Sequence, residues 1–171
     1  MFRLRKVLNE EDTFWVFALI VETYMTPDYY VDMYGATTQA NILSRIFRQY
    51  NMLPGVTEAF EKLNISLITF SVNWFISIFT AALPEESSLK VLDLFLLKGQ
   101  TNSKIIFDVS LAILRILEDQ IVACDDMSDF YTKIFVSSNE ALKDSKRLIE
   151  EVCSPKNQLK QAHIDFYRPV C

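Results

Sequence analysis

The chain has 171 residues, half of them hydrophobic and 13% aromatic, and its 17 Lys and Arg against 22 Asp and Glu give a formal net charge of −5. Such an apolar composition excludes a disordered chain, because burial can offset the entropy of ordering it. The acidic balance argues against nucleic acid as a partner, since phosphate binding depends on clustered Lys and Arg. The three Gly and five Pro are fewer than a sandwich or barrel with many tight turns needs, so we expect long helices.

Apolar residues recur with the period of an α-helix along most of the chain, and strand alternation is not convincing anywhere. The spacing predicts helices over residues 10–25, 37–50, 54–63, 66–83, 85–98, 103–123 and 127–136. Pro27 breaks the first of them, Lys98 and Gly99 close the fifth, and Asp125 or Asp126 caps the seventh. The predicted fold is all-α, a non-bundle stack of about seven to nine helices.

Residues 63–84 contain no charged side chain and are long enough to span a bilayer. Small polar residues recur within them at intervals of three or four, which places them along one stripe of a helix. The stripe consists of Ser66, Thr69, Asn73, Ser77 and Thr80. This pattern is typical of a fully buried central helix, and the flanks lack the basic residues of a membrane span. We therefore predict a helix in the core, with a membrane span near 63–84 as the alternative.

The most hydrophobic side chains of that helix are expected to lie almost wholly inside the core. They are Trp74, Phe75, Ile78 and Phe79.

The composition changes after residue 136. Residues 137–171 are richer in charged and polar side chains, and a break occurs at 154–157. The tail from Gln158 to Cys171 is polar apart from Phe166 and Tyr167, and polar chain ends of this kind are usually poorly anchored. We therefore divide the chain into a folded unit, 1–136, and an appended helix and polar tail, 137–171, in which His163 is expected to be exposed. The basic run at 3–6 is interpreted as a solvated helix end.

No residue pattern indicates metal binding or a cofactor. Cys124, Cys153 and Cys171 are widely spaced and are interpreted as reduced thiols, and the single His163 cannot complete a zinc site. Glycine-rich loops that bind phosphate are absent from the sequence. The sequence therefore predicts no cofactor.

Acidic residues gather at Asp125, Asp126 and Asp129. They lack the glycine and the final glutamate of an EF-hand loop, so a helix cap is the preferred interpretation. These carboxylates disfavour the thiolate of Cys124, which argues against a nucleophilic cysteine. We predict no catalytic, cofactor-binding or metal-binding residue in this chain.

Aromatic and acidic motifs follow one another in a definite order, and the acids suit a helix N-terminus whereas the aromatics suit a core face. They are Glu10-Glu11-Asp12-Thr13-Phe14-Trp15, Met25-Thr26-Pro27-Asp28-Tyr29-Tyr30, Trp74-Phe75 with Phe79, Leu83-Pro84, and Asp93-Leu94-Phe95-Leu96 before Gly99. In this order and at nearly this spacing, over roughly residues 9–136, the motifs resemble the C-terminal part of a TBC domain. Proteins of that family activate GTP hydrolysis by Rab small GTPases. The resemblance implies the fold of the C-terminal subdomain of a TBC domain and a Rab-type GTPase as partner.

The sequence departs from the family pattern in two places. Lys90 and Leu92-Asp93 stand where many members have Arg and Trp-Asp, a difference that concerns packing. The family's arginine finger (Ile-x-x-Asp-x-x-Arg) and glutamine finger (Tyr-x-Gln-Gly) precede the acidic opening, and Met1 lies only a few residues before that opening. Because an arginine finger contributes roughly 10³–10⁵ in rate, we expect the chain as written to be catalytically incomplete and not an enzyme activator by itself.

Arg147 follows Asp144 at the spacing of the arginine-finger motif. The isoleucine is missing, however, and no Tyr-x-Gln follows it. We interpret these two residues as an ion pair on the surface of a helix.

Three interpretations stay open. The chain is a fragment or shortened gene model of a complete activator, a natural truncated form that binds without catalysis, or an unrelated all-helical interaction domain. The first two imply a cytoplasmic protein that reaches endomembranes through its partners.

In a complete TBC domain, N-terminal helices should cover the helices that begin at Glu10 and Ser66. The segment 1–8 is too short to replace them, so we expect exposed apolar surface at this place. Such surface usually marks a partner site or a tendency to aggregate. The chain should therefore self-associate, bind a partner or an N-terminal half, or use its own C-terminal helix as a lid.

Overall fold

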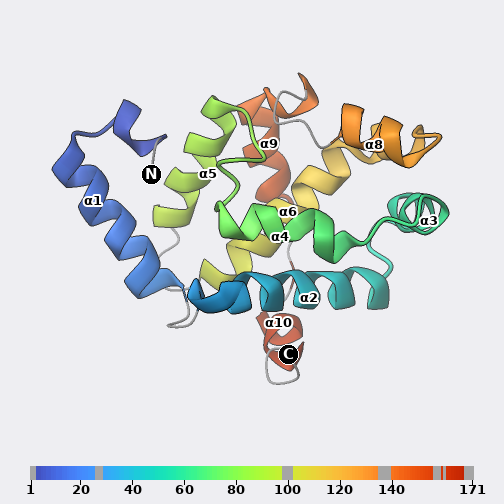
Figure 1. The fold of residues 1–171 in the computed structure, drawn as a ribbon, viewed down its shortest axis with the longest axis horizontal. Coiled ribbons are helices and arrows are strands. Elements are labelled where there is room, and N and C mark those ends of the chain that lie inside the picture. Colours follow the sequence, from blue (N-terminus) through green and yellow to red (C-terminus); the bar gives the residue numbers. More distant parts are fainter. Residues whose placement is uncertain are drawn as a thin grey trace.

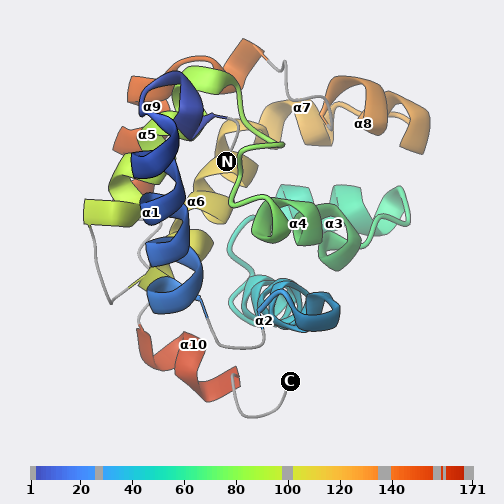
Figure 2. The ribbon, with the colours of Figure 1, turned by 60° about the vertical axis from the view of Figure 1, so that its left-hand side comes forward.

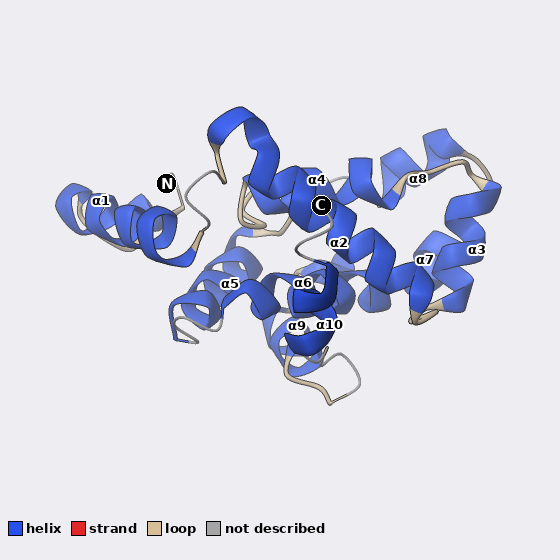
Figure 3. Cartoon of the chain, turned by 90° about the horizontal axis from the view of Figure 1, so that it is seen from below, coloured by secondary structure: helices blue, strands red, loops and turns tan. Residues whose placement is uncertain are grey.

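The computed structural model describes residues 3–25, 29–97, 102–134, 140–155, 159 and 161–167, and these residues form helices without strands (Figure 3). The α-helices are α1 (Glu10–Leu19), α2 (Tyr34–Gln49), α3 (Pro54–Lys62), α4 (Leu67–Ile76), α5 (Glu85–Leu97), α6 (Asn102–Ile116), α7 (Glu118–Val122), α8 (Met127–Lys133), α9 (Ser145–Val152) and α10 (Gln161–Tyr167). Shorter helical turns are η1 (Leu4–Lys6), η2 (Ile20–Tyr24, a π-helical turn), η3 (Val31–Met33) and η5 (Glu140–Leu142). The predicted all-α class is confirmed.

The helices form a stack and not a parallel bundle. α2 and α4 pack along one another across the molecule, and α5, α6 and α9 form a second packed group (Figure 1). α3 packs on α7 at one end of the molecule, whereas α1 lies at the opposite end (Figures 1 and 3). The two ends of the stack therefore present separate surfaces.

The central helix is α6, which contacts α4, α5, α7 and α9. Every residue from Ile105 to Leu114 is at most 5% exposed. Even Asp108 is buried, where it pairs with Lys104 at 2.9 Å and accepts a hydrogen bond from the backbone N–H of Leu159 at 3.4 Å. The ion pair with Lys104 offsets the cost of burying the Asp108 carboxylate.

The expectation of a fully buried helix over 66–83 is wrong. α4 ends at Ile76, and Ser66, Thr69 and Asn73 face solvent, so the polar stripe is the outer side of an amphipathic helix. The predicted core positions are nevertheless confirmed, because Trp74, Phe75, Ile78 and Phe79 are at most 6% exposed. No helix in the described part of the chain, the segment near 63–84 included, is long and apolar enough to cross a membrane.

Other boundaries were predicted with mixed success. The expected helix 103–123 is divided near Leu117 into α6 and α7, and α2 begins three residues before the expected start. Asp126 caps α8 by accepting a hydrogen bond from the N–H of Asp129 at 2.8 Å, as expected. The end signals at Pro27, Lys98 and Gly99 lie outside the described residues.

The tail from Gln158 to Cys171 was expected to be poorly anchored, and for its described part this is wrong. α9 packs on α5 and α6, and α10 packs on α2 (Figure 2). Leu148, Val152 and Ile164 are at most 2% exposed. His163 is half-buried and stacks on Tyr50 with ring centroids 4.6 Å apart. A thin apolar stripe thus suffices to hold short helices against an existing core.

The basic run at the N-terminus was expected to be a solvated helix end, which is wrong for Arg3. The Arg3 guanidinium donates hydrogen bonds to the carbonyl oxygens of Thr80 and Leu83, at 3.0 and 3.1 Å. Lys6 forms an ion pair with Glu85 at 2.5 Å. These hydrogen bonds and this ion pair hold the N-terminal segment against the turn between α4 and α5 and the start of α5.

Candidate functional site

The main candidate site is an exposed apolar surface on α1, here called the α1 face. It consists of Phe14, Trp15 and Leu19, which are 53%, 60% and 42% exposed. The main contacts of α1 are with η1 and η2, the turns on either side of it in sequence. Figure 3 shows α1 projecting from one end of the stack. The expectation that the aromatics of the acidic motif face the core is therefore wrong for Phe14 and Trp15. Two aromatic rings and a leucine on one short helix are available to another polypeptide.

Local signals explain why α1 forms without extensive packing. The Asn9 side chain caps it by accepting a hydrogen bond from the N–H of Asp12 at 2.8 Å. Glu10, Glu11 and Asp12 occupy the first turn, where the helix dipole favours negative charge. The rings of Phe14 and Trp15 meet edge to face at a centroid distance of 5.2 Å. The α1 face is therefore prearranged by the helix itself.

A second exposed apolar group follows α1 in sequence. Its members are Tyr30, Val31, Met33 and Tyr34, each at least 41% exposed. Beneath them Tyr29 is buried and donates a hydrogen bond to the carbonyl oxygen of Phe75 at 3.1 Å. Burial raises the pKa of the Tyr29 phenol far above its usual value. This hydrogen bond fixes the start of α2 against α4.

Gly35 allows the close approach on which this arrangement depends. A Cβ atom at Gly35 would lie 2.5 Å from the Cα atom of Tyr29 and 2.7 Å from its ring. Contacts this short are not compatible with any side chain at position 35 unless the backbone moves. The glycine therefore helps to place the exposed segment.

The structure does not give Arg147 the contact expected from the sequence. Asp144 caps α9 by accepting a hydrogen bond from the backbone N–H of Arg147 at 3.0 Å. The predicted side-chain ion pair is not among the contacts of the described residues, and Arg147 is exposed. The spacing of Asp144 and Arg147 thus reflects a helix cap.

The acidic group near α8 is explained by local structure. Asp126 is the helix cap, and Asp129 pairs with Lys133 at 2.7 Å, which lowers the pKa of the Asp129 carboxyl. Among the described residues, no three His, Cys, Asp or Glu side chains are grouped to hold a metal ion. The pKa of the Cys124 thiol is raised, chiefly by burial and then by Asp129, in agreement with the expected disfavoured thiolate.

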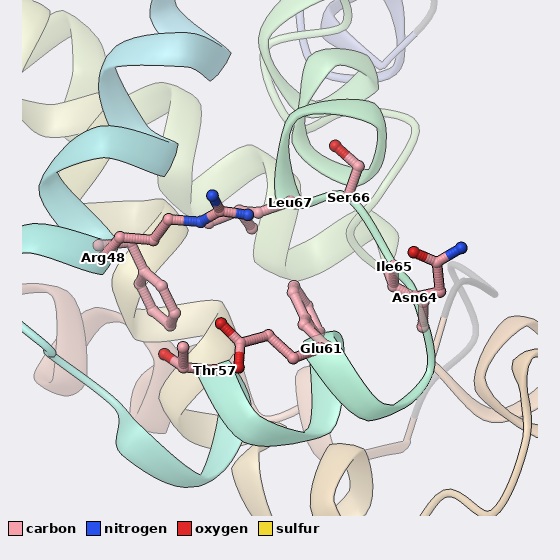
Figure 4. Close-up of a pocket in the computed structure, with 9 residues that line it drawn as sticks. Arg48, Thr57, Glu61, Asn64, Ile65, Ser66 and Leu67 are labelled. Carbon is pink, nitrogen blue, oxygen red and sulfur yellow. The ribbon is translucent and has the colours of Figure 1, made fainter.

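Sequence reasoning missed a pocket of about 320 Å³ between α2, α3 and the start of α4 (Figure 4). It is lined by Phe47, Arg48, Thr57, Phe60, Glu61, Asn64, Ile65, Ser66 and Leu67. Phe47, Phe60 and Leu67 are buried, whereas Arg48 and Glu61 are exposed. Three separate elements supply this lining, so no single motif in the sequence indicates it.

Comparison with known proteins gives a consistent assignment. The family model of the Rab-GTPase-TBC domain matches residues 2–122. The mouse protein TBC1 domain family member 2B is 33% identical over 148 residues, which are 83% of this chain and 14% of that protein. Human Growth hormone-regulated TBC protein 1 is 27% identical over 165 residues, covering 95% of this chain and 47% of that protein. Human Small G protein signaling modulator 3 is 24% identical over 128 residues, which are 74% of this chain and 16% of that protein. The chain thus spans less than half the length of each of these relatives.

Proposed function

Because the chain belongs to the Rab-GTPase-TBC domain family, we propose that it acts as part of a GTPase-activating protein for a Rab-type small GTPase. Family membership is the observation that carries this proposal. It also contradicts the interpretation as an unrelated helical interaction domain. On the same basis we propose a cytoplasmic protein that reaches endomembranes through partner proteins.

We further propose that these 171 residues do not supply the catalytic fingers. Neither Ile-x-x-Asp-x-x-Arg nor Tyr-x-Gln occurs in the sequence. Arg147 and Arg168 each follow an aspartate at the spacing of the arginine-finger motif, but the isoleucine position holds Ala141 in one case and Ala162 in the other. Phosphoryl transfer needs a cation at the transferring group and a residue that orients water. The cation and the water-orienting residue would both have to come from a polypeptide segment outside these 171 residues.

The α1 face is the place where we propose that such polypeptide packs. Burial of each large apolar side chain would contribute about 1.5–3 kcal/mol. The described C-terminal helices do not act as the lid that the sequence left open, because α9 packs chiefly on α5 and α6, and α10 on α2. The exposed rings of Phe14 and Trp15 therefore support a contact with an N-terminal part of a TBC domain.

This proposal is tested by mixing the 171-residue chain with the N-terminal half of the TBC domain of mouse TBC1 domain family member 2B. We expect association, measured by sedimentation, that is weakened by the double substitution Phe14→Ser and Trp15→Ser. Phe166→Ser on α10 is the matched control, because Phe166 is 71% exposed on another helix. Association that is unaffected by the α1 substitutions would contradict the proposal.

A further inference from the structure

The pocket between α2, α3 and α4 is lined by two opposite charges, Arg48 and Glu61, that form no ion pair with each other. Arg48 extends into it from α2 and Glu61 from α3 (Figure 4). Within the part of the chain that the structure describes, neither side chain has an ion-pair partner within 4 Å. Side chains of this kind can each pair with a charge on another molecule.

Two hydroxyl groups of the pocket, those of Thr57 and Ser66, extend this separation. The Thr57 hydroxyl donates to the carbonyl oxygen of Leu53 at 3.2 Å, which leaves its oxygen lone pairs as acceptors beside Glu61. The Ser66 oxygen accepts from the N–H of Thr69 at 3.5 Å, which leaves its proton as a donor. In Figure 4, Arg48 and Ser66 lie on one side of the opening and Thr57 and Glu61 on the other. The pocket has a donor side and an acceptor side.

The floor between the two sides is apolar. Phe47, Phe60 and Leu67 line the pocket and are each at most 5% exposed as residues. A space of about 320 Å³ accommodates a few side chains but is at the small end of pockets for drug-sized ligands. The occupant that fits is therefore a short peptide segment and not a large cofactor.

We propose that this pocket binds an extended peptide segment of a partner protein that carries an acidic, an apolar and a basic side chain in alternation. The acidic side chain pairs with Arg48 and accepts from Ser66. The basic side chain pairs with Glu61, and the apolar side chain lies on the aromatic floor. Side chains at i, i+2 and i+4 of an extended segment share one face, so one segment can present all three.

The proposal goes beyond the activity of the family and does not depend on the α1 face. α3 and α1 lie at opposite ends of the molecule (Figure 1). Substitutions in the pocket therefore leave the association through the α1 face intact, and the two proposals can fail separately.

The test uses the full chain and the blocked peptide Gly-Glu-Ser-Leu-Ser-Lys-Gly. Binding is measured by NMR, with the backbone signals of Thr57, Glu61 and Ser66 as reporters. We expect these signals to shift with a dissociation constant in the range of about 0.1–1 mM. Replacing Glu and Lys of the peptide by Gln should abolish the shifts. Absence of binding at about 5 mM peptide, or equal binding of the uncharged peptide, would overturn the proposal.

Charge-reversal substitutions in the protein test whether the peptide binds in this pocket. Arg48→Glu should weaken binding of the mixed-charge peptide about tenfold and improve binding of the version with Lys at both charged positions. Glu61→Lys should likewise weaken binding of the mixed-charge peptide and improve binding of the version with Glu at both charged positions. The controls are Arg45→Glu and Glu58→Lys, exposed residues of the same two helices outside the pocket. Equal losses in the controls would overturn the assignment to this pocket.

Discussion

The backbone N–H of Phe79 donates a hydrogen bond to the carbonyl oxygen of Trp74 at 2.7 Å, and this bond ends α4. The N–H of Ile78 donates to the carbonyl of Phe75 at 3.3 Å. The two bonds form a Schellman motif, in which the residue at the position of Ile78 takes a left-handed conformation. The turn that follows carries the carbonyl groups that Arg3 binds, so the end of α4 also places the N-terminal segment.

At the end of α4 the left-handed position of this motif is occupied by an unusual residue type, isoleucine. α2 and α3 end with the same hydrogen-bond pattern, but there the left-handed residues are Asn51 (φ 43°) and Asn64 (φ 53°). Asparagine tolerates this conformation, whereas a β-branched residue is strained in it. Ile78 has φ 47° and is 6% exposed. Burial of its side chain therefore holds a strained backbone.

We expect Ile78→Gly to be more stable than Ile78→Ala by about 1 kcal/mol, because both lose the buried side chain but only glycine relieves the left-handed strain. The free energy of unfolding of each variant is measured with urea. Ile46, buried inside α2, is the control position, where Ala should be the more stable replacement. If the Gly and Ala variants had the same order of stability at Ile78 and at Ile46, the result would contradict backbone strain at Ile78.

Gly35→Ala is expected to destabilise the chain by about 1–3 kcal/mol, because the added Cβ atom would displace the backbone of Tyr29. Gly55→Ala is the matched control. A Cβ there would meet the Val122 side chain at 3.2 Å, and this exposed side chain can move. Thermal unfolding of both variants should show a clear loss for the first and a small change for the second. A stable Gly35→Ala variant would rule out the close approach of Tyr29.

The two tryptophans should differ strongly in their access to water. Trp15 is 60% exposed on the α1 face and Trp74 is 4% exposed. With Trp74→Phe the remaining emission should be red-shifted and readily quenched by acrylamide, and with Trp15→Phe it should be blue-shifted and protected. Equal protection of the two rings in dilute monomer would show that the α1 face is covered within this chain.

The stability of the N-terminal anchor should depend on pH. A hydrogen bond from Lys6 lowers the pKa of Glu85 below its ordinary value of 4.5. A carboxyl with a lowered folded-state pKa stabilises the fold above its unfolded pKa, and the contribution disappears as the pH falls through the folded value. Lys6→Met should therefore reduce the loss of melting temperature between about pH 7 and about pH 3.

The control for that experiment is Lys146→Met, which removes an ammonium 3.9 Å from Glu150 on the exposed side of α9. We expect the pH dependence of this variant to follow that of the unchanged chain. If Lys6→Met also follows the unchanged chain, the pair between Lys6 and Glu85 does not anchor the N-terminus in solution.

Helical periodicity was enough to predict the fold class, the approximate positions of the longer helices and the aromatic core around Trp74. It could not predict the end of α4, because Ile78 carries no local signal for a left-handed turn and only tertiary burial stabilises it there. It also missed α10, a seven-residue helix whose few apolar side chains become significant only when α2 is present.

The candidate site was predictable in part. The expectation of uncovered apolar surface was derived from the family, and α1 indeed exposes Phe14 and Trp15, whereas the expectation is wrong for α4, whose exposed side chains are polar. The pocket at Arg48 and Glu61 was not predictable, since its members are distributed over three elements and their proximity arises only from packing. Similarly, Arg3 had no sequence signal for binding carbonyl groups about 80 residues away.

The proposed lack of both catalytic fingers is tested by GTP hydrolysis in a panel of Rab GTPases, with the purified 171-residue chain as the added protein. We expect the intrinsic rate of hydrolysis for every member of the panel, because neither finger motif occurs in the sequence. Stimulated hydrolysis that disappears with Arg147→Ala would contradict this expectation, since Arg147, an exposed side chain in the first turn of α9, would then be a finger.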